Sequence, residues 1–150
     1  MDAAEEADPN RTGEILHASC VAYQGRALLI TGASGAGKSG LALQLMAIGA
    51  DLVADDRTRI WAENGQVLAA PAPNIEGLIE MRGLGLLQAD HVAKASVIAV
   101  VDLDLTEADR LPGAHVTRLV GVDLPLLKRV DSPIFPAALL QYLKAGRRTP

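Results

Sequence analysis

The sequence predicts an α/β fold in which a mixed β-sheet is flanked by helices. Two short apolar runs, residues 27–31 and 96–103, are typical of strands that are buried on both faces of a sheet. Residues 38–49 instead carry apolar side chains at helical spacing and end in a glycine, as an amphipathic helix does. Hydrophobic residues make up 49% of the 150 residues and aromatic residues only 3%, so the core must consist of aliphatic side chains. A chain of this length can bury enough apolar surface to fold as one domain.

The first half of the chain predicts two strands and a helix around a glycine-rich loop. Residues 14–22 alternate loosely between apolar and polar side chains and predict a strand, which a turn at Gln24 and Gly25 follows. The run 27–31 leads into the glycine-rich loop, and the predicted helix 38–49 leaves it. This order of strand, loop and helix places the run 27–31 in the centre of the sheet.

A third strand is predicted at residues 52–54, and it ends in Asp55 and Asp56. A helix separates this run from the run 27–31, and strands joined by a helix usually lie parallel. We therefore expect residues 52–54 to lie parallel to the strand before the loop and directly beside it.

The second half of the chain predicts a hairpin, further strands and a closing helix. Residues 59–61 and 67–69 flank Asn64 and Gly65, a dipeptide that favours a two-residue β-hairpin turn. The remaining predicted elements are a strand at 77–81 that enters a glycine-rich turn at 82–85, the strand at 96–103, a pair of strands at 115–120 and 124–130, and a helix at 136–145 that Gly146 ends.

Composition and charge exclude several classes of protein. The net charge of −4 argues against a nucleic-acid-binding domain. No apolar run approaches the roughly 18 residues of a membrane span, and residues 1–10 lack the pattern of a signal peptide, so we expect a cytoplasmic protein. The single cysteine, Cys20, lies in an apolar stretch and is interpreted as a buried hydrophobic residue. We expect one domain at residues 12–146, between a flexible acidic segment at 1–11 and a flexible basic tail at 147–150.

Residues 32–39 match the phosphate-binding pattern Gly-x-x-x-x-Gly-Lys-[Ser/Thr] without a mismatch. Glycines allow consecutive backbone N–H groups to surround phosphate oxygens, and the following helix adds the positive end of its dipole. Lys38 can reach the β- and γ-phosphates, and the Ser39 hydroxyl can bind Mg²⁺. The predicted nucleotide-binding residues are Gly32, Ala33, Ser34, Gly35, Ala36, Gly37, Lys38 and Ser39. The motif predicts a P-loop that binds ATP and Mg²⁺, with an incidental glycine-rich turn as the alternative, and it does not identify the reaction.

Three carboxylates are candidates for the chemistry. Asp55 and Asp56 follow a predicted strand, and adjacent residues of a strand point to opposite faces. One of them can therefore face the γ-phosphate while the other holds the structure, although a turn cap is the alternative for the pair. Glu80 lies in the apolar run 77–81 and would need a cation or a metal if it were buried. A surface-facing glutamate is the alternative for that residue.

The histidines and the tryptophan are interpreted as structural. His17 alone is more typical of a hydrogen-bonded structural histidine than of a catalytic one. His91 and His115 have no metal-ligand spacing to a cysteine or another histidine, so both are interpreted as structural or surface residues. Trp61, beside the predicted hairpin, is interpreted as a packing residue rather than a base-stacking one.

Four separated segments carry a resemblance to a known family. They are Leu-His-Ala-Ser at 16–19, the P-loop at 32–39, Leu-Val-Ala-Asp-Asp-Arg at 52–57 and Glu-Met-Arg-Gly-Leu-Gly at 80–85. In this order and spacing the sequence resembles the catalytic domain of HPr kinase/phosphorylase across residues 14–105. It is most similar to the short, catalytic-domain-only form known in alphaproteobacteria, which accompanies a regulatory phosphotransferase system. The resemblance implies a nucleotide-binding core like that of phosphoenolpyruvate carboxykinase.

The resemblance implies a protein-serine kinase that uses ATP and Mg²⁺ to phosphorylate the phosphocarrier protein HPr. It also implies the reverse reaction, in which inorganic phosphate removes the phosphoryl group and pyrophosphate forms. The expected partners are thus HPr, ATP or ADP, phosphate and pyrophosphate, with no nucleic acid and no membrane, and a homo-oligomer is compatible with the family.

The resemblance also assigns a role to each candidate residue. It implies that Asp55 is the general base towards the serine and the acid in the reverse direction. The remaining implied roles are orientation of the site by Asp56 and His17, Mg²⁺ binding by Ser39 and Glu80, contact with HPr by Arg82, Gly83 and Gly85, and neutralisation of phosphate charge by Arg110.

The sequence departs from the family pattern at three places. Gly40 follows Ser39 where an acidic residue is usual, the region after residue 85 is shortened, and residues 129–133 replace a stretch rich in proline and arginine. Two other functions therefore remain as alternatives. One is a kinase of small molecules, which would favour an arginine-rich lid that residues 86–115 lack. The other is a non-catalytic sensor that binds partners in an ATP-dependent way.

Overall fold

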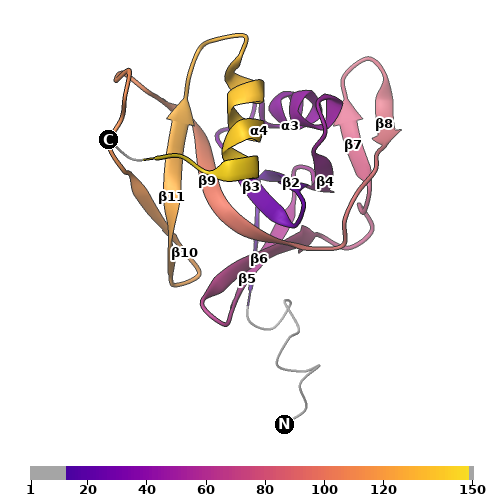
Figure 1. Ribbon diagram of the computed structural model, residues 1–150. Helices are drawn as coiled ribbons and strands as arrows, with labels where there is room; N and C mark the ends of the chain where they lie inside the picture. The colour runs from indigo at the N-terminus through magenta and orange to yellow at the C-terminus, as the bar shows by residue number, and fades with distance from the viewer. Residues whose placement is uncertain (1–12, 149–150) are drawn as a thin grey trace.

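The computed structural model describes residues 13–148, which form one mixed sheet, a separate hairpin and two helices (Figure 1). The predicted flexible segment 1–11 and the last two residues of the predicted tail lie outside the described residues. In chain order the elements are β1 (Glu14–Leu16), β2 (Ser19–Tyr23), β3 (Arg26–Thr31), α3 (Lys38–Ala47), β4 (Asp51–Ala54), β5 (Thr58–Glu63), β6 (Gln66–Pro71), β7 (Leu78–Met81), β8 (Gly85–Gln88), β9 (Ala95–Thr106), β10 (Val116–Leu119), β11 (Val122–Arg129) and α4 (Phe135–Ala145).

Strand β3 occupies the centre of the sheet, as its sequence predicts. It pairs with β9 in parallel on one side and with β2 in antiparallel on the other. Its side chains alternate between two cores, because Leu28 and Ile30 pack with the helices while Leu29 packs on the opposite face. Burial of both faces explains why this strand is a continuous apolar run.

Strand β4 does not lie directly beside β3, so the expectation that these two strands are neighbours is wrong. The order of the sheet is β1-β5-β6-β9-β3-β2-β4, so β2 separates the two strands. Both β3 and β4 pair with β2 in antiparallel, so they run in the same direction without touching as neighbours. The neighbouring parallel strand of β3 is β9, which follows it much later in the chain.

The predicted strand at 14–22 is divided in two by His17 and Ala18. The Ala18 N–H donates to Leu16 O and to Asp56 O, at 3.0 and 3.1 Å, and this turn separates β1 from β2. Strand β1 pairs with β5, whereas β2 pairs with β3 and β4. The turn therefore carries the chain from one end of the sheet to its other half.

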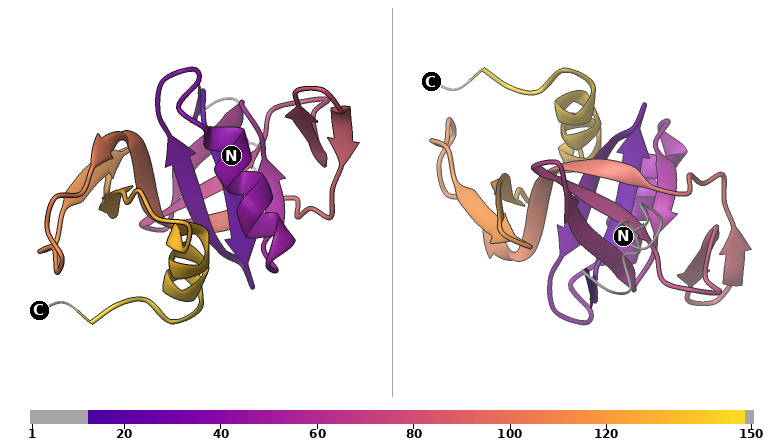
Figure 2. Two further views of the ribbon diagram at one scale, coloured as in Figure 1. Left: turned by 90° about the horizontal axis from the view of Figure 1, so that it is seen from above. Right: turned by 90° about the horizontal axis from the view of Figure 1, so that it is seen from below.

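Both helices lie on the same face of the sheet rather than on its two faces (Figures 1 and 2). Helix α3 buries Leu41 and Leu45, and helix α4 buries Leu140 and Leu143, all within one core cluster. The opposite face is covered by the sheet itself, since β5 and β6 curl over it and place Ile60 and Val67 in a second cluster. The sheet itself therefore covers the face that the two helices leave open.

Local turn signals are confirmed where the backbone requires them. Asn64 and Gly65 connect β5 to β6 with φ values of 53° and 76°. Positive values at both central positions are those of a type I′ turn, which matches the twist of a hairpin. Trp61 is 5% exposed, which confirms that it packs.

Long strand β9 joins the two halves of the sheet. Its first residues pair with β6, its later residues pair with β11, and β3 runs along its other edge. The strand pair β10–β11, predicted from the sequence, then continues the sheet at one side (Figure 1). As a result, the end of β9 lies next to the end of β3 and to the loop that follows it.

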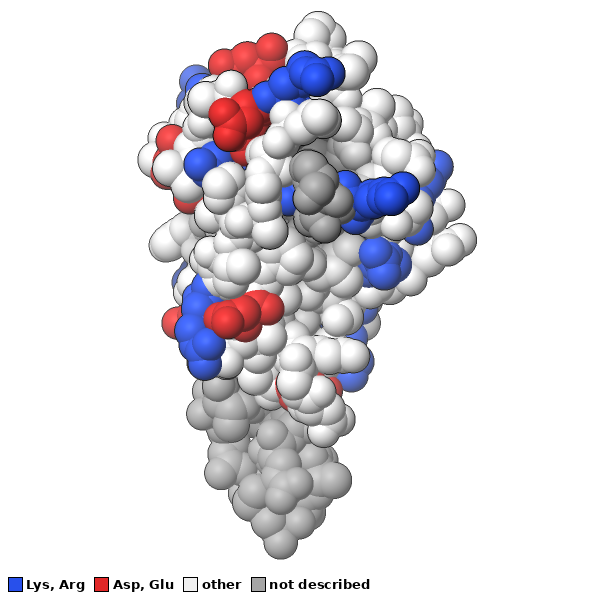
Figure 3. Space-filling view, turned by 60° about the vertical axis from the view of Figure 1, so that its left-hand side comes forward, with Lys and Arg blue, Asp and Glu red and all other residues white. Residues whose placement is uncertain are grey.

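The described surface carries no long apolar helix and no broad basic area on the face shown in Figure 3. Within residues 13–148, no helix is long and apolar enough to cross a membrane. On this face, acidic and basic side chains occur in small groups separated by uncharged areas.

Candidate active site

The glycine-rich loop connects β3 to α3 at the centre of the sheet. Gly32 has φ 149°, and a Cβ atom there would lie 3.1 Å from Ala36 Cβ and 3.2 Å from Leu103 Cβ. Gly37, with φ 99°, is the N-cap of α3. A side chain at Gly32 would be crowded and one at Gly37 strained, so the close turn of the backbone requires glycine. The loop ends at the N-terminus of α3, where the first N–H groups of a helix are free to bind an anion.

Lys38 and Asp104 hold the two sides of this loop. The Lys38 ammonium donates to Gly32 O at 2.8 Å and to Ala33 O at 3.1 Å. The Ala33 N–H donates to both carboxylate oxygens of Asp104, at 3.1 and 3.0 Å. A loop N–H that binds a carboxylate in this way can bind a phosphate oxygen by the same geometry.

Asp104 is a site residue that the sequence analysis missed. It stands near the end of β9 together with Asp102, whose Oδ1 accepts the N–H of Asp104 at 2.9 Å. Strand β9 is the parallel neighbour of β3, so these are the acidic residues at the position expected for Asp55 and Asp56. The signal was available in the acidic residues at the end of the longest apolar run.

Asp55 reaches the loop from β4 across the intervening strand β2. Its side chain is 6% exposed, and its Oδ1 accepts hydrogen bonds from Ser39 Oγ at 2.7 Å and from Ser19 Oγ at 2.8 Å. Its Oδ2 accepts one hydrogen bond from the described residues, from the backbone N–H of Glu80 at 3.4 Å. The carboxylate is thus held through one oxygen, and the other keeps most of its capacity to accept a proton.

Ser19 belongs to this group, although the sequence analysis gave it no role. It is fully buried in β2, and its hydroxyl donates to Asp55 while it accepts the Asp56 N–H at 3.4 Å. A serine in an otherwise apolar buried strand was the signal, because a buried hydroxyl needs a partner.

Asp56 differs from Asp55 in both exposure and backbone. It is exposed and has φ 68°, a left-handed conformation that costs a non-glycine residue about 1 kcal/mol. The two aspartates follow β4 in a bend rather than within the strand. The two side chains thus have different surroundings, but not because they alternate along a strand, as the sequence analysis expected.

A polar cleft of about 480 Å³ brings together seven of the residues that the sequence singles out. It lies between the start of α3, the end of β4 and the hairpin formed by β7 and β8. Its lining consists of Ser39, Asp55, Asp56, Glu80, Met81, Arg82, Gly83 and Gly85. Glu80 is exposed at this cleft rather than buried, so it needs no permanent partner.

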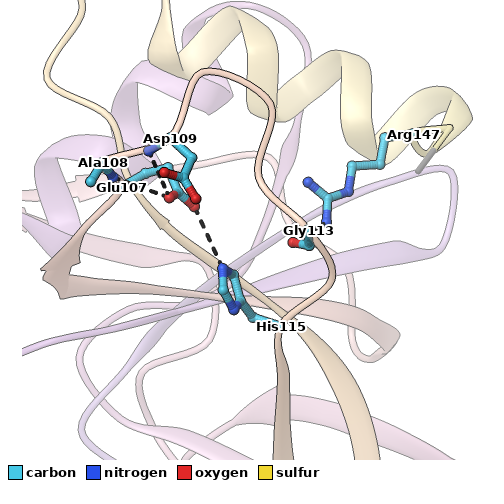
Figure 4. Close-up of polar contacts among 6 residues, drawn as sticks. All are labelled: Glu107, Ala108, Asp109, Gly113, His115 and Arg147. Carbon is cyan, nitrogen blue, oxygen red and sulfur yellow. Dashed lines mark hydrogen bonds and ion pairs between the residues drawn. The ribbon is translucent and has the colours of Figure 1, made fainter. Parts of the chain in front are cut away.

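His17 and Arg110 do not line the polar cleft. His17 is exposed in the turn between β1 and β2, next to Ala18, which bonds to Asp56 O. Arg110 is exposed in the loop between β9 and β10. That loop is held by Glu107, which accepts the N–H groups of Ala108 and Asp109 and lies 3.8 Å from His115 (Figure 4).

The oxygen donors of the cleft suit Mg²⁺ only in part. Ser39, Asp55 and Glu80 supply a hydroxyl and two carboxylates, the ligand types that Mg²⁺ prefers. Within residues 13–148, no group of three or more His, Cys, Asp and Glu side chains is arranged to hold a metal ion. Mg²⁺ commonly completes its coordination with water and substrate phosphates, so these residues fit an ion that arrives with a nucleotide.

Comparisons with known proteins agree with this arrangement. The HPr serine kinase C-terminal domain model matches residues 11–106. The HPr kinase/phosphorylase of Bacillus velezensis is 37% identical over 127 residues, and that of Geobacillus thermodenitrificans is 38% identical over 140 residues. These matches cover 79% and 85% of the chain but 39% and 45% of the two relatives, so the chain spans less than half of their length.

A solved structure has the same fold. The HPr(Ser) kinase/phosphatase from Coxiella burnetii superposes with a TM-score of 0.73 at 23% identity, over 87% of this chain and 93% of that one. The sequence matches include the loop, the end of β4 and the hairpin that together line the polar cleft. The chain therefore belongs to the family of the HPr serine kinase C-terminal domain.

Proposed function

We propose that the protein is an ATP- and Mg²⁺-dependent kinase that phosphorylates a serine of an HPr-type phosphocarrier protein. The observation that carries the proposal is the hydrogen bond between Asp55 and Ser39. It places a buried carboxylate against the first turn of the helix that follows the phosphate loop. The family membership supports HPr as the protein that supplies the serine.

In the proposed reaction the loop N–H groups and Lys38 bind the β- and γ-phosphates. Ser39 and Glu80 would hold Mg²⁺, which neutralises charge on these phosphates. The serine of the phosphocarrier enters the polar cleft, and Asp55 Oδ2 takes the proton from its hydroxyl. The serine oxygen forms a bond to the γ-phosphorus while the bond from that phosphorus to the β–γ bridging oxygen breaks, and ADP leaves. Positioning and charge neutralisation supply most of the catalysis in such a transfer.

The same arrangement can support the reverse direction. An oxygen of inorganic phosphate bound at the loop would form a bond to the phosphorus of seryl-phosphate while the bond from that phosphorus to the serine oxygen breaks. Asp55 would pass the proton of the attacking phosphate to the serine oxygen. The products are the unmodified phosphocarrier and pyrophosphate. Arg82 and the glycines beside it line the side of the cleft where the protein substrate would enter.

The proposal is tested by phosphate transfer from ATP to a purified HPr-type protein in the presence of Mg²⁺. We expect one serine to be labelled by the wild type. Asp55→Asn should lower the rate by about 10²- to 10⁴-fold, because a general base contributes on this order. Asp123→Asn is the matched control, since Asp123 is exposed in an ion pair with Arg118 away from the cleft. Phosphate transfer by this variant should stay within about twofold of the wild-type rate.

Several results would contradict the assignment. Full activity of Asp55→Asn would exclude Asp55 as the base. Turnover of ATP with small alcohols but not with the phosphocarrier would indicate a small-molecule kinase, and binding of ATP without any transfer would indicate a sensor. Addition of phosphate to the phosphorylated product should release pyrophosphate if the reverse reaction occurs.

A further inference from the structure

A small cavity lies between helix α4, strand β11 and the loop at residues 107–115, which joins β9 to β10. It has a volume of about 180 Å³. None of the described residues that line this cavity also lines the polar cleft. The proposed phosphate transfer therefore makes no use of it.

The walls of this cavity are apolar. Helix α4 contributes Leu139, which is 4% exposed, and the half-buried aromatic side chains of Phe135 and Tyr142. Strand β11 contributes Leu126 and Leu127, which are also half-buried. Walls of this kind favour a ligand with an apolar body, because both surfaces leave water when the ligand binds.

The rest of the lining is polar and carries an excess of positive charge. It includes Glu107, His115, Lys128 and Arg147. With the histidine neutral, the two cationic side chains outweigh the one carboxylate. A charge next to apolar walls is poorly screened by water, so its attraction for an opposite charge is stronger than at an open surface. The cavity therefore favours an anionic group on the ligand.

The carboxylate of Glu107 is already bound by the backbone of its own loop. Its Oε2 accepts the N–H groups of Ala108 and Asp109, at 3.1 and 3.2 Å (Figure 4). Its Oε1 lies 3.8 Å from His115 Nε2, which is too long for a hydrogen bond. The two backbone donors offset the charge of this carboxylate, so it does not cancel the cationic side chains of the cavity.

His115 and Arg147 have hydrogen-bonding capacity left for a ligand. His115 Nε2 is buried and makes no hydrogen bond with a described residue. A buried polar atom without a partner is rare in folded proteins and calls for an explanation. Arg147 Nη2 donates to Gly113 O at 3.1 Å, which fixes the guanidinium over the loop (Figure 4). The other N–H groups of a guanidinium held in this way can bind a carboxylate.

We propose that this cavity binds a small monocarboxylate with an aromatic or branched apolar body. The carboxylate lies against Arg147 and His115 Nε2, and the apolar body lies between Leu126 of β11 and Leu139 of α4. The cavity is smaller than the pockets that hold drug-sized ligands, so the ligand is correspondingly short. This site is independent of the proposed kinase activity.

The first test is an NMR titration of the backbone amide signals with four probes. Phenylacetate and isocaproate have both the carboxylate and the apolar body, phenylacetamide lacks the charge, and acetate lacks the body. We expect at least one of the first two to bind saturably and to shift signals of residues that line the cavity. Phenylacetamide and acetate should bind about 10-fold more weakly or less, because each lacks one of the two complementary groups.

Three results of this titration would overturn the proposal. One is the absence of saturable binding by both phenylacetate and isocaproate. Another is equal affinity for phenylacetate and for phenylacetamide or acetate. The third is a set of shifted signals confined to the phosphate loop, which would indicate that the anion binds there instead.

The second test uses two pairs of variants with the carboxylate that binds. Ala138 is exposed on α4 and lines the cavity, so Ala138→Leu narrows it, whereas the exposed neighbour Ala137 does not line it and Ala137→Leu is the control. Arg147→Gln removes the charge but keeps an amide donor, and Arg148→Gln is its control. Leucine forms helices nearly as well as alanine, so the variants should fold, which thermal unfolding checks.

We expect Ala138→Leu and Arg147→Gln to bind the carboxylate about 10-fold more weakly, and both controls to stay within about twofold of the wild type. Unchanged affinity in the two cavity variants would overturn the site. Equal weakening within either pair would do so as well, because it would show that the effect does not depend on the cavity.

Discussion

At the scale of single residues, the candidate site depends on one carboxylate that two hydroxyls hold in place. Asp55 Oδ1 accepts hydrogen bonds from Ser39 of the helix and from Ser19 of the sheet, so the position of this carboxylate, the proposed base, depends on both elements. The site is therefore built from buried polar contacts, which are costly to leave incomplete. Neither hydroxyl has to touch the substrate for its loss to alter the geometry of Asp55.

The contribution of Ser19 can be measured by its replacement with alanine. Ser19→Ala leaves Asp55 with one hydroxyl fewer, and we expect the free energy of unfolding to fall by about 1–2 kcal/mol. Phosphate transfer should also slow, because Asp55 loses one of its supports. Urea denaturation gives the stability. Ser96→Ala is the control, since Ser96 is only half-buried and its hydroxyl makes one long hydrogen bond of 3.5 Å, to Gln66, and the stability of this variant should change by less than about 0.5 kcal/mol. Equal effects of the two substitutions would contradict the supporting role.

At the scale of elements, turns and loops bring the strands and helices of the site together. The hairpin β5–β6 is directed by the Asn64-Gly65 turn, and its curl covers the face of the sheet that the helices leave open. The hairpin β7–β8 supplies one side of the polar cleft. A position in such a turn needs glycine only where its φ is positive, because other residues readily adopt a negative φ.

This distinction predicts different effects for two alanine substitutions. Gly65 and Gly113 both have open space around a Cβ atom, but only Gly65 has a positive φ, of 76°. Gly65→Ala should destabilise the protein by about 1 kcal/mol because of the left-handed conformation. Gly113→Ala should leave stability unchanged or slightly higher. Thermal unfolding of the two variants provides the comparison, and equal melting temperatures would show that the turn does not need glycine.

At the scale of the whole molecule, the sheet separates two hydrophobic cores. Cys20 lies in the second core with an exposed fraction of 0%, beside Leu29 and Val53. Burial raises the pKa of the Cys20 thiol, because the thiolate would lose its solvation there. This agrees with its interpretation as a buried hydrophobic residue and excludes a role as an exposed nucleophile.

The raised pKa makes global stability sensitive to alkaline pH. In the unfolded chain the thiol loses its proton above its ordinary pKa of about 8.5, while the folded protein keeps it. The free energy of unfolding therefore falls as the pH rises above that value. Below it the thiol is protonated in both states and causes no loss of stability. Between pH 8 and pH 10 the wild type should lose about 2 kcal/mol more than Cys20→Ala. Urea denaturation at the two pH values tests this, and parallel losses in both proteins would contradict it.

Local spacing in the sequence predicts much of the fold. The strand β3, the loop after it and helix α3 are confirmed because each depends on neighbouring residues: an apolar run, glycines and helical periodicity. The β5–β6 hairpin is confirmed for the same reason. The single predicted strand at 14–22 was wrong because its break at His17 and Ala18 depends on a hydrogen bond to Asp56, far along the chain.

The sequence by itself determined which residues could form the site: a phosphate-binding loop, two aspartates after a short strand, and a glycine-rich turn after Glu80. Only the tertiary structure decided which of them meet. Strand β2 lies between β3 and β4, so Asp55 reaches Ser39 across a strand, and Asp104 takes the place beside the loop that the sequence reserved for Asp55. Residue spacing encodes local conformation, but the order of strands results from the burial of both sheet faces, which involves the whole chain.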